Sequence, residues 1–355
     1  MKNNRFLKRL TGDYLTYALL LVVFAAVQIW QSSGQMSSLF KGLLVPMCIY
    51  SIMAVSLNLT VGIMGELSLG HAGFMCIGAF TGAIFTNLTK NSMTAELPRF
   101  ILALLLGAAV AAVFGFLIGI PVLRLKGDYL AIVTLAFGEI IKNIMQVIYI
   151  GVDSKGIHVA MNSASNLKME AGGKQLMKGA LGINGTPKQS TFAIAFICLL
   201  ITLIIVLNLM HSRSGRAVMA IRDNRIAAES VGIDVTKYKM LAFVVSASLA
   251  GVAGVLYSHN ISSLQSQAQN FGYNMSIMVL VYVVLGGLGN MRGSIIAACI
   301  LTALPELLRG FNNYRMLIYA IVLIVLMIFN WAPAVLEWRE KTAARFRRKS
   351  VKEVQ

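Results

Sequence analysis

Charged side chains inside apolar stretches are the first candidates for chemistry in this sequence. Glu139 and Lys142 lie three residues apart in the segment DYLAIVTLAFGEIIKN, which begins at Asp128. This spacing places both side chains on one face of a helix, where opposite charges offset each other's desolvation. The pair therefore lies along a pathway or at a subunit interface, or it is a structural ion pair.

A glycine-rich stretch from Ser56 to Gly82 is the second candidate region. Its glycines recur every three to five residues, which allows helices to approach closely and allows a helix break that exposes backbone groups to a cavity. Glu66 and His71 are costly at membrane depth, so they line a pathway, or hold a broken segment by hydrogen bonds, or cap helices at the cytoplasmic surface. The candidate pathway or helix-packing residues of this stretch are Asn58, Gly65, Glu66, Ser68, Gly70, His71 and Gly73.

The polar segment 211–240 alternates apolar and charged residues. Ala227, Ala228 and Val231 occupy nearby positions on a predicted helix, and Gly232 follows in the place of a glycine that ends a helix. A short helix between two membrane spans can act as a lever, because a partner that pushes it moves both flanking helices. The alternative is a basic loop that lies on the lipid head groups.

Motifs for catalysis and metal binding are absent from the sequence. Gly172, Gly173 and Lys174 are followed by Gln175 and lack the rest of a G-x-x-x-x-G-K-[ST] phosphate loop. The histidines and cysteines show no metal-ligand spacing, and every cysteine falls within an apolar run. We expect buried thiols, no catalytic residue, no metal site, no cofactor bound by this chain and no ATP hydrolysis.

The composition excludes an ordinary globular protein, since 57% of the residues are hydrophobic, 13% are charged and the mean hydropathy is +0.74. A helix needs about 20 apolar residues to cross a hydrocarbon core of roughly 30 Å. Runs of that kind recur along the chain and predict an all-α polytopic membrane protein with about ten transmembrane helices. The predicted spans are 14–30, 39–61, 68–87, 100–120, 129–150, 191–210, 241–257, 274–288, 294–308 and 316–331.

The net charge of +17 reflects basic residues between the apolar runs and in the tail. They form no patch interleaved with aromatic residues, so the charge favours a membrane surface over nucleic acid. With the N-terminus inside, the cytoplasmic segments hold 20 Lys and Arg residues and the external segments hold 9. The positive-inside rule thus places both termini in the cytoplasm.

This orientation organises the chain as a single transmembrane domain over residues 1–355. Its parts are a cytoplasmic N-terminus (1–13), an external loop (151–190) that is either a docking surface or a solvated connector, a cytoplasmic loop (211–240) and a basic cytoplasmic tail (332–355). The first apolar run resembles a secretory signal, but its length and the lack of an A-x-A site favour an uncleaved helix. Broken or re-entrant helices are possible at 58–75 and 286–313, where the pattern is interrupted.

Three segments in order resemble the LivM-type permease of branched-chain amino acid ABC importers. They are SLNLTVGIMGELSLGHAGFMCIGAFTGA, LRLKGDYLAIVTLAFGEIIKN and SGRAVMAIRDNRIAAESVGIDVTKYKMLAFVVSA, and the resemblance covers roughly 39–310. The third resembles the E-A-A-x-x-x-G coupling loop of importer permeases, with Ile226 in place of the glutamate and without the apolar–proline ending. The candidate ATPase-coupling residues are Arg222, Asp223, Ala227, Ala228, Glu229 and Gly232, and the two alanines are expected to let the helix sit in a groove of the ATPase.

The resemblance implies the larger, many-helix class of ABC importer permease in the cell inner membrane. It implies a complex with a LivH-type second permease, two cytoplasmic ABC ATPases that use ATP and Mg, and a periplasmic solute-binding protein. The implied solutes are leucine, isoleucine and valine, and urea or short amides are the alternative, because weakly charged spans suit both.

Two other classes of protein, a secondary transporter or channel and an intramembrane enzyme, would require different residues. A secondary transporter or channel would need ion or proton coupling of its own, for which Glu66, Glu139 and Lys142 are the notable intramembrane candidates. An intramembrane enzyme would need paired carboxylates or a Ser/His arrangement, and neither occurs in a plausible register. The docking helix expected at 211–240 favours an ATP-driven permease.

Overall fold

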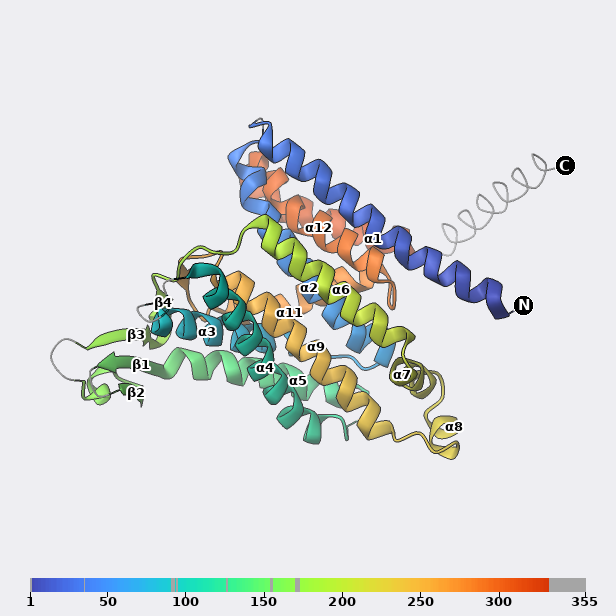
Figure 1. The fold of residues 1–355 in the computed structure, drawn as a ribbon, viewed down its shortest axis with the longest axis horizontal. Coiled ribbons are helices and arrows are strands. Elements are labelled where there is room, and N and C mark those ends of the chain that lie inside the picture. Colours follow the sequence, from blue (N-terminus) through green and yellow to red (C-terminus); the bar gives the residue numbers. More distant parts are fainter. Residues whose placement is uncertain are drawn as a thin grey trace. The chain divides into compact units, whose positions relative to one another are not determined.

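A computed structural model describes residues 2–34, 36–90, 93, 95–125, 127–153, 156–169 and 173–331. Contacts group the chain into two compact units, Met1–Cys299 and Ile300–Gln355. Helices dominate, as the sequence predicts (Figure 1). The first part of the chain forms α1 (Lys2–Ser32), α2 (Ser38–Asn58), α3 (His71–Thr89), α4 (Glu96–Val122), α5 (Asp128–Val147) and α6 (Phe192–His211). Then come α7 (Arg213–Asp223), α8 (Arg225–Ser230), α9 (Val235–Ser258), α10 (Ala268–Phe271), α11 (Tyr273–Gly286), α12 (Met291–Leu307) and α13 (Arg315–Trp331).

Eight helical stretches among the described residues are long and apolar enough to cross a membrane. They are Ser38–Met64, His71–Thr89, Glu96–Val122, Asp128–Val147, Phe192–His211, Val235–Ser258, Ala268–Gly286 and Met291–Gly310. The two other predicted spans coincide with α1, whose apolar part is Thr16–Ser32, and with the 17-residue α13. The prediction of a polytopic helical membrane protein is confirmed, and the predicted cytoplasmic tail 332–355 lies outside the described residues.

A small antiparallel sheet, which the sequence analysis did not predict, occupies much of the loop after α5. Its strands are β1 (Ile148–Asp153), β2 (Gly156–Met161), β3 (Lys174–Lys178), β4 (Ile183–Asn184) and β5 (Ser263–Leu264), in the spatial order β2-β1-β3-β4-β5. Because β1 follows α5 without a break, its apolar residues read as the end of a transmembrane span. The sheet fixes the path of the long loop and ties it to the segment after α9.

The sheet and the pair α7 and α8 lie at opposite ends of the helices in the first unit (Figure 1). The helix α9 starts just after α8 and ends shortly before β5, and its 24 residues span about 36 Å. Helices α5 and α6 also join the sheet end to the α7 end. The unit therefore has two chemically different ends on either side of a helical core.

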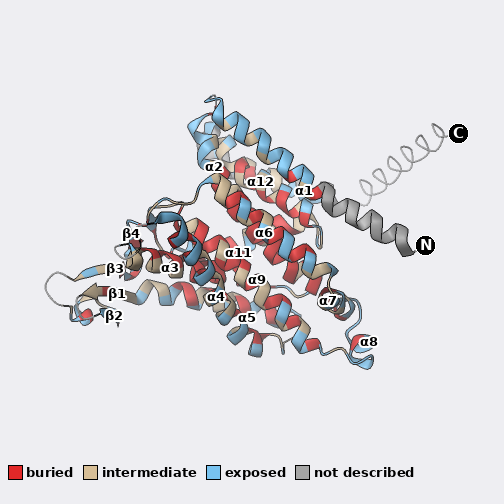
Figure 2. Cartoon of the chain, viewed as in Figure 1, coloured by how far each residue is buried: buried red, intermediate tan, exposed pale blue. Residues whose placement is uncertain are grey.

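Glycines let α3, α4 and α9 pack closely at the core of this unit, where much of α9 is buried (Figure 2). A Cβ atom added to Gly78 would lie 2.2 Å from the carbonyl oxygen of Gly251, and one added to Gly254 would lie 2.0 Å from that of Met75. Since real Cβ atoms do not approach so closely, these contacts require glycine. The close helix approach predicted from the glycine spacing is confirmed at Gly78.

The chain breaks where the glycine pattern suggests a break. Helix α2 widens into a π-helical turn, Leu59–Met64, which ends at Gly65 with φ of +77°. Residues 66–70 are not helical, and α3 begins at His71. A second break, Gly287–Asn290, separates α11 from α12 within the other doubtful stretch. The two breaks meet in space, where Gly62 lies against Gly289.

Candidate functional site

The segment between α6 and α9 folds into two short helices with well-defined ends. The side chain of Ser212 accepts a hydrogen bond from the backbone N–H of Gly215 at the start of α7. Asn224 caps α8 in the same way through Ala227, at 3.1 Å. Such caps satisfy backbone donors that a helix start leaves free. The predicted short helix is therefore present, preceded by a second helix that was not predicted separately.

Gly232 ends α8 with the conformation expected of a glycine stop. Its φ is +83°, its N–H donates to the carbonyl of Glu229, and the N–H of Ile233 donates to the carbonyl of Ala228. These two bonds form a Schellman motif, which favours glycine because other residues resist positive φ. An added Cβ at this position meets no atom within 4 Å, so backbone conformation alone selects glycine here.

Ala228 does not lie where the sequence analysis placed it. It is 4% exposed and packs against Ile221 and Val235 of the flanking helices. Because α8 folds back on α7 and α9, this face is used inside the segment and cannot enter a groove of a partner in this conformation. The exposed apolar residues are instead Ile226 and Val231, with 80% and 75% of their surface accessible, and Ala227 is exposed beside them.

Arg222 joins this segment to the break after α2. Its Nη1 donates a hydrogen bond of 2.8 Å to the carbonyl of Gly62 in the π-helical turn. The side chain also passes against Gly65, where an added Cβ would lie 2.6 Å from Cγ of Arg222. A guanidinium at the end of a helix satisfies a free carbonyl and interacts favourably with the helix dipole. Arg222 also pairs with Asp223, a contact between exposed side chains.

The π-helical turn in turn contacts the loop between α11 and α12. Asn58 is fully buried, donates to Oγ of Ser294 at 2.8 Å and accepts from the N–H of Gly289 at 2.8 Å. An added Cβ on Gly62 would lie 2.2 Å from the Gly289 nitrogen. A continuous set of contacts thus runs from α7 through Arg222 and the π-helical turn to the α11–α12 loop.

Glu66 forms an ion pair with Lys239 of α9, a partner that its sequence neighbours do not reveal. Their side chains are 15% and 10% exposed, so the pair is largely desolvated. His71 is also buried and lies 2.7 Å from Oγ of Ser56, measured from Nε2. The two contacts hold the broken segment against α2 and α9, which is one of the alternatives left open for Glu66 and His71.

Gly70 and Gly73, two of the remaining candidates of the glycine-rich stretch, serve close packing. An added Cβ on Gly70 would lie 2.1 Å from the carbonyl oxygen of Thr134, and one on Gly73 would lie 2.8 Å from Cα of Gly138. Ser68 is buried, and its hydroxyl has no hydrogen-bond partner among the described residues. The structure therefore brings α3 against α5 through backbone contacts.

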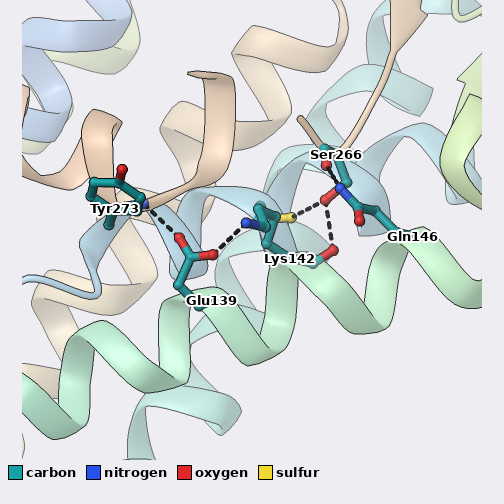
Figure 3. A network of polar contacts seen from close by, with 6 residues as sticks. Glu139, Lys142, Gln146, Ser266 and Tyr273 are labelled. Atoms are coloured by element: carbon teal, nitrogen blue, oxygen red, sulfur yellow. Dashed lines mark hydrogen bonds and ion pairs between the residues drawn. The ribbon is translucent and has the colours of Figure 1, made fainter. Parts of the chain in front are cut away.

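Glu139 and Lys142 form the ion pair that their spacing predicts (Figure 3). The second carboxylate oxygen of Glu139 accepts a hydrogen bond of 2.8 Å from the backbone N–H of Tyr273, the first residue of α11. Close by, Oγ of Ser266 donates to the carbonyl of Lys142 at 2.9 Å, and Gln146 donates to the carbonyl of Ser266. The pair therefore belongs to a network that fixes the start of α11 beside α5.

Sequence reasoning missed Lys239, Ser294 and the link from Arg222 to Gly62. Each acts through a residue more than 150 positions away. The sequence contains one local sign of these contacts, which is that polar residues flank the chain breaks after α2 and α11. Within the described ranges, no three His, Cys, Asp or Glu side chains gather as metal ligands.

A profile of the family described as "Branched-chain amino acid transport system / permease component" matches residues 39–329. The chain belongs to this family. It is thus a multi-pass membrane protein and a permease component of an ABC importer, a type of subunit that carries no catalytic site. The family region includes the π-helical turn, α7, α8 and the Glu139 network.

Individual relatives agree with the family. The high-affinity branched-chain amino acid transport system permease protein LivM of Salmonella typhimurium is 34% identical over 300 residues, which are 80% of this chain and 67% of the relative. LivM of Escherichia coli K12 is 33% identical with the same coverage. The ribose import permease protein RbsC of Escherichia coli K12 is 27% identical over 292 residues, 79% of this chain and 81% of that protein. Relatives named for different solutes therefore share the permease architecture.

Proposed function

We propose that this permease takes up the branched-chain amino acids leucine, isoleucine and valine. The observation that supports this solute class is the identity of 33–34% with two LivM proteins, compared with 27% for the ribose permease. Urea and short amides are the alternative solutes, because weakly charged spans suit them equally.

Transport requires partners that supply the energy and the solute. The proposed complex contains a LivH-type second permease, two cytoplasmic ABC ATPases that bind ATP and Mg, and a periplasmic solute-binding protein. Both termini of this chain lie in the cytoplasm, which puts α7 and α8 on the cytoplasmic side and the sheet outside. The 20 to 9 distribution of basic residues supports this orientation.

The segment α7–α8 couples this subunit to an ATPase. Its short helices sit between two spans, and Arg222 connects them to the break after α2 through the carbonyl of Gly62. A displacement of α7 would therefore pull on the π-helical turn and on the α11–α12 loop. Ile226 and Val231 provide the apolar contact, because large apolar side chains exposed on a polar segment mark an interaction site.

The solute assignment is tested by uptake in a strain that lacks the whole import system. The strain is complemented with the full set of importer genes, and labelled leucine, urea and ribose are supplied separately. Leucine uptake that depends on this chain is expected, with little uptake of the other two. Uptake of urea or ribose but not leucine would overturn the solute assignment.

The docking surface is tested by Ile226→Glu, which places a charge on the proposed contact without touching the buried face of α8. Co-purification of the ATPase subunits should fall about tenfold or more, since a desolvated charge without a partner is costly. Thr236→Glu is the control, because it adds the same charge at an exposed residue of α9 that lies outside the proposed contact. Equal ATPase recovery from both variants would exclude Ile226 from the interface.

A further inference from the structure

The start of α11 lies deep beside α5, not at the end of the span. Glu139, which accepts from the N–H of Tyr273, is eight residues before the last residue of α5. At about 1.5 Å per residue, this places the start of α11 roughly 12 Å from the sheet end of α5. The chain must therefore descend from β5 to this depth before α11 begins.

The descending segment, residues 265–272, is irregular at 265–267 and bends at Gly272, and the four-residue α10 lies between these two parts. Ser266 binds the carbonyl of Lys142 and accepts from Gln146, so the segment runs along α5. Irregular backbone at membrane depth is found only where protein buries it or where it lines a water-filled cavity. One side of this segment is buried, since Phe271 is fully inaccessible, and its other side is open.

The open side is polar. Gln267, Gln269 and Asn274 are exposed, and Tyr273 has 46% of its surface accessible. The Glu139 side chain remains 24% exposed while Lys142 behind it is 10% exposed. Lipid cannot cover a carboxylate and several amides at this depth without a large free-energy cost. This face is therefore covered by water or by protein in the assembled transporter, and not by lipid.

We propose that this face is the wall of the solute pathway contributed by this subunit, and that Glu139 receives the ammonium group of the passing amino acid. The inference rests on the proposed function for the identity of the solute. The partly exposed carboxylate suits an ammonium group, and the exposed side-chain amides of Gln267, Gln269 and Asn274 on the adjoining segment are donors that can serve the solute carboxylate along the same wall.

Glu139 holds the solute weakly, as transport requires. Its charge is already balanced by Lys142, and one oxygen accepts from Tyr273. An ammonium group therefore meets a carboxylate that is partly satisfied, so the site does not trap the solute. Sites in a conduction path must bind strongly enough to admit a solute and weakly enough to release it.

The pathway wall is tested by cysteine accessibility in the assembled importer, in membrane vesicles with the external face outward. Asn274→Cys and Gln269→Cys are treated with a charged, membrane-impermeant methanethiosulfonate. Leu105→Cys on α4 is the control, because Leu105 is 62% exposed on an apolar helix. The unchanged chain is treated in the same way, and it measures how much reagent reacts with the native cysteines.

Modification of Asn274→Cys or Gln269→Cys, with none at Leu105→Cys, is the expected result, and it should block uptake. If neither pathway variant reacts more than Leu105→Cys, the face is not aqueous and the proposal is overturned. This labelling does not depend on which solute is transported. Failure of the solute assignment would instead appear as absent leucine uptake by the unchanged chain.

The role of Glu139 is tested separately with the double variant Glu139→Gln and Lys142→Met, which removes both charges and keeps an acceptor for Tyr273. Leucine uptake should fall about tenfold at equal protein level and equal thermal stability, the loss expected for one charge-assisted hydrogen bond. An unchanged KM and rate would show that the pair is only structural and that Glu139 does not contact the solute.

Discussion

Two ion pairs in the helical core differ in how far apart their partners lie in the sequence. Glu139 and Lys142 are three residues apart on α5, whereas Glu66 and Lys239 are separated by 173 positions. The first pair follows from helix geometry alone. The second exists only because the fold brings the break after α2 against the first turns of α9, so it reports on tertiary structure.

The pairs also differ in their surroundings. Glu66 and Lys239 are both largely buried, while Glu139 keeps about a quarter of its side chain exposed. A buried pair that joins two elements stabilises a chain break, because loss of either partner leaves an uncompensated charge. A local pair with an exposed carboxylate can also serve a solute. We therefore expect a structural role for the Glu66–Lys239 pair, whereas Glu139 of the local pair is the residue proposed to contact the solute.

The largest effect on stability is expected for Lys239→Met. This change leaves the largely buried carboxylate of Glu66 without its partner. It should lower the free energy of unfolding by about 3 kcal/mol. Thermal unfolding of the purified assembly measures the loss. Lys237→Met is the matched control, because Lys237 is exposed on the same helix. Similar unfolding temperatures for the two variants would show that the Glu66–Lys239 pair does not stabilise the fold.

A smaller effect on stability is expected for single changes at the local pair. Lys142→Met leaves the charge of Glu139 without a counterion, although the carboxylate is partly solvated. This change should lower the free energy of unfolding by about 1–2 kcal/mol and lower the protein level. Adding Glu139→Gln should recover much of the level, because the glutamine still accepts from Tyr273. If the double variant lowers the protein level by as much as the two single variants together, the two charges do not stabilise each other.

The smallest of these effects is expected at Gly232, which belongs to neither pair and affects only the end of α8. Gly232→Val forces a β-branched residue to a φ of +83° and should lower the local stability of the end of α8 by about 1 kcal/mol. Gly232→Asn should be nearly neutral, since asparagine tolerates this conformation. Hydrogen exchange of α8 in the assembled importer measures the difference, and equal exchange in both variants would contradict the glycine stop.

The sequence predicted what local rules determine. The apolar runs predicted the membrane spans. The three-residue spacing predicted the Glu139–Lys142 ion pair, and Gly232 predicted the end of α8. It could not predict the partner of Glu66 or the packing of Ala228, because both depend on where α9 lies relative to α2 and α7. The sheet was missed for a related reason: the residues of β1 are apolar and follow α5 directly, so length and hydropathy do not separate strand from helix.

In the proposed coupling, α7 transmits movement to the membrane-spanning helices through Arg222. The direct measurement compares solute-stimulated ATP hydrolysis and leucine uptake in vesicles reconstituted with the complete importer. Arg222→Gln removes the guanidinium that binds the carbonyl of Gly62, and the matched control Arg216→Gln changes an arginine of α7 that bonds to the carbonyl of nearby His211. We predict that Arg222→Gln retains the ATPase subunits but loses most uptake per ATP hydrolysed, while the control remains at the parental ratio. A parental ratio for Arg222→Gln would contradict the account.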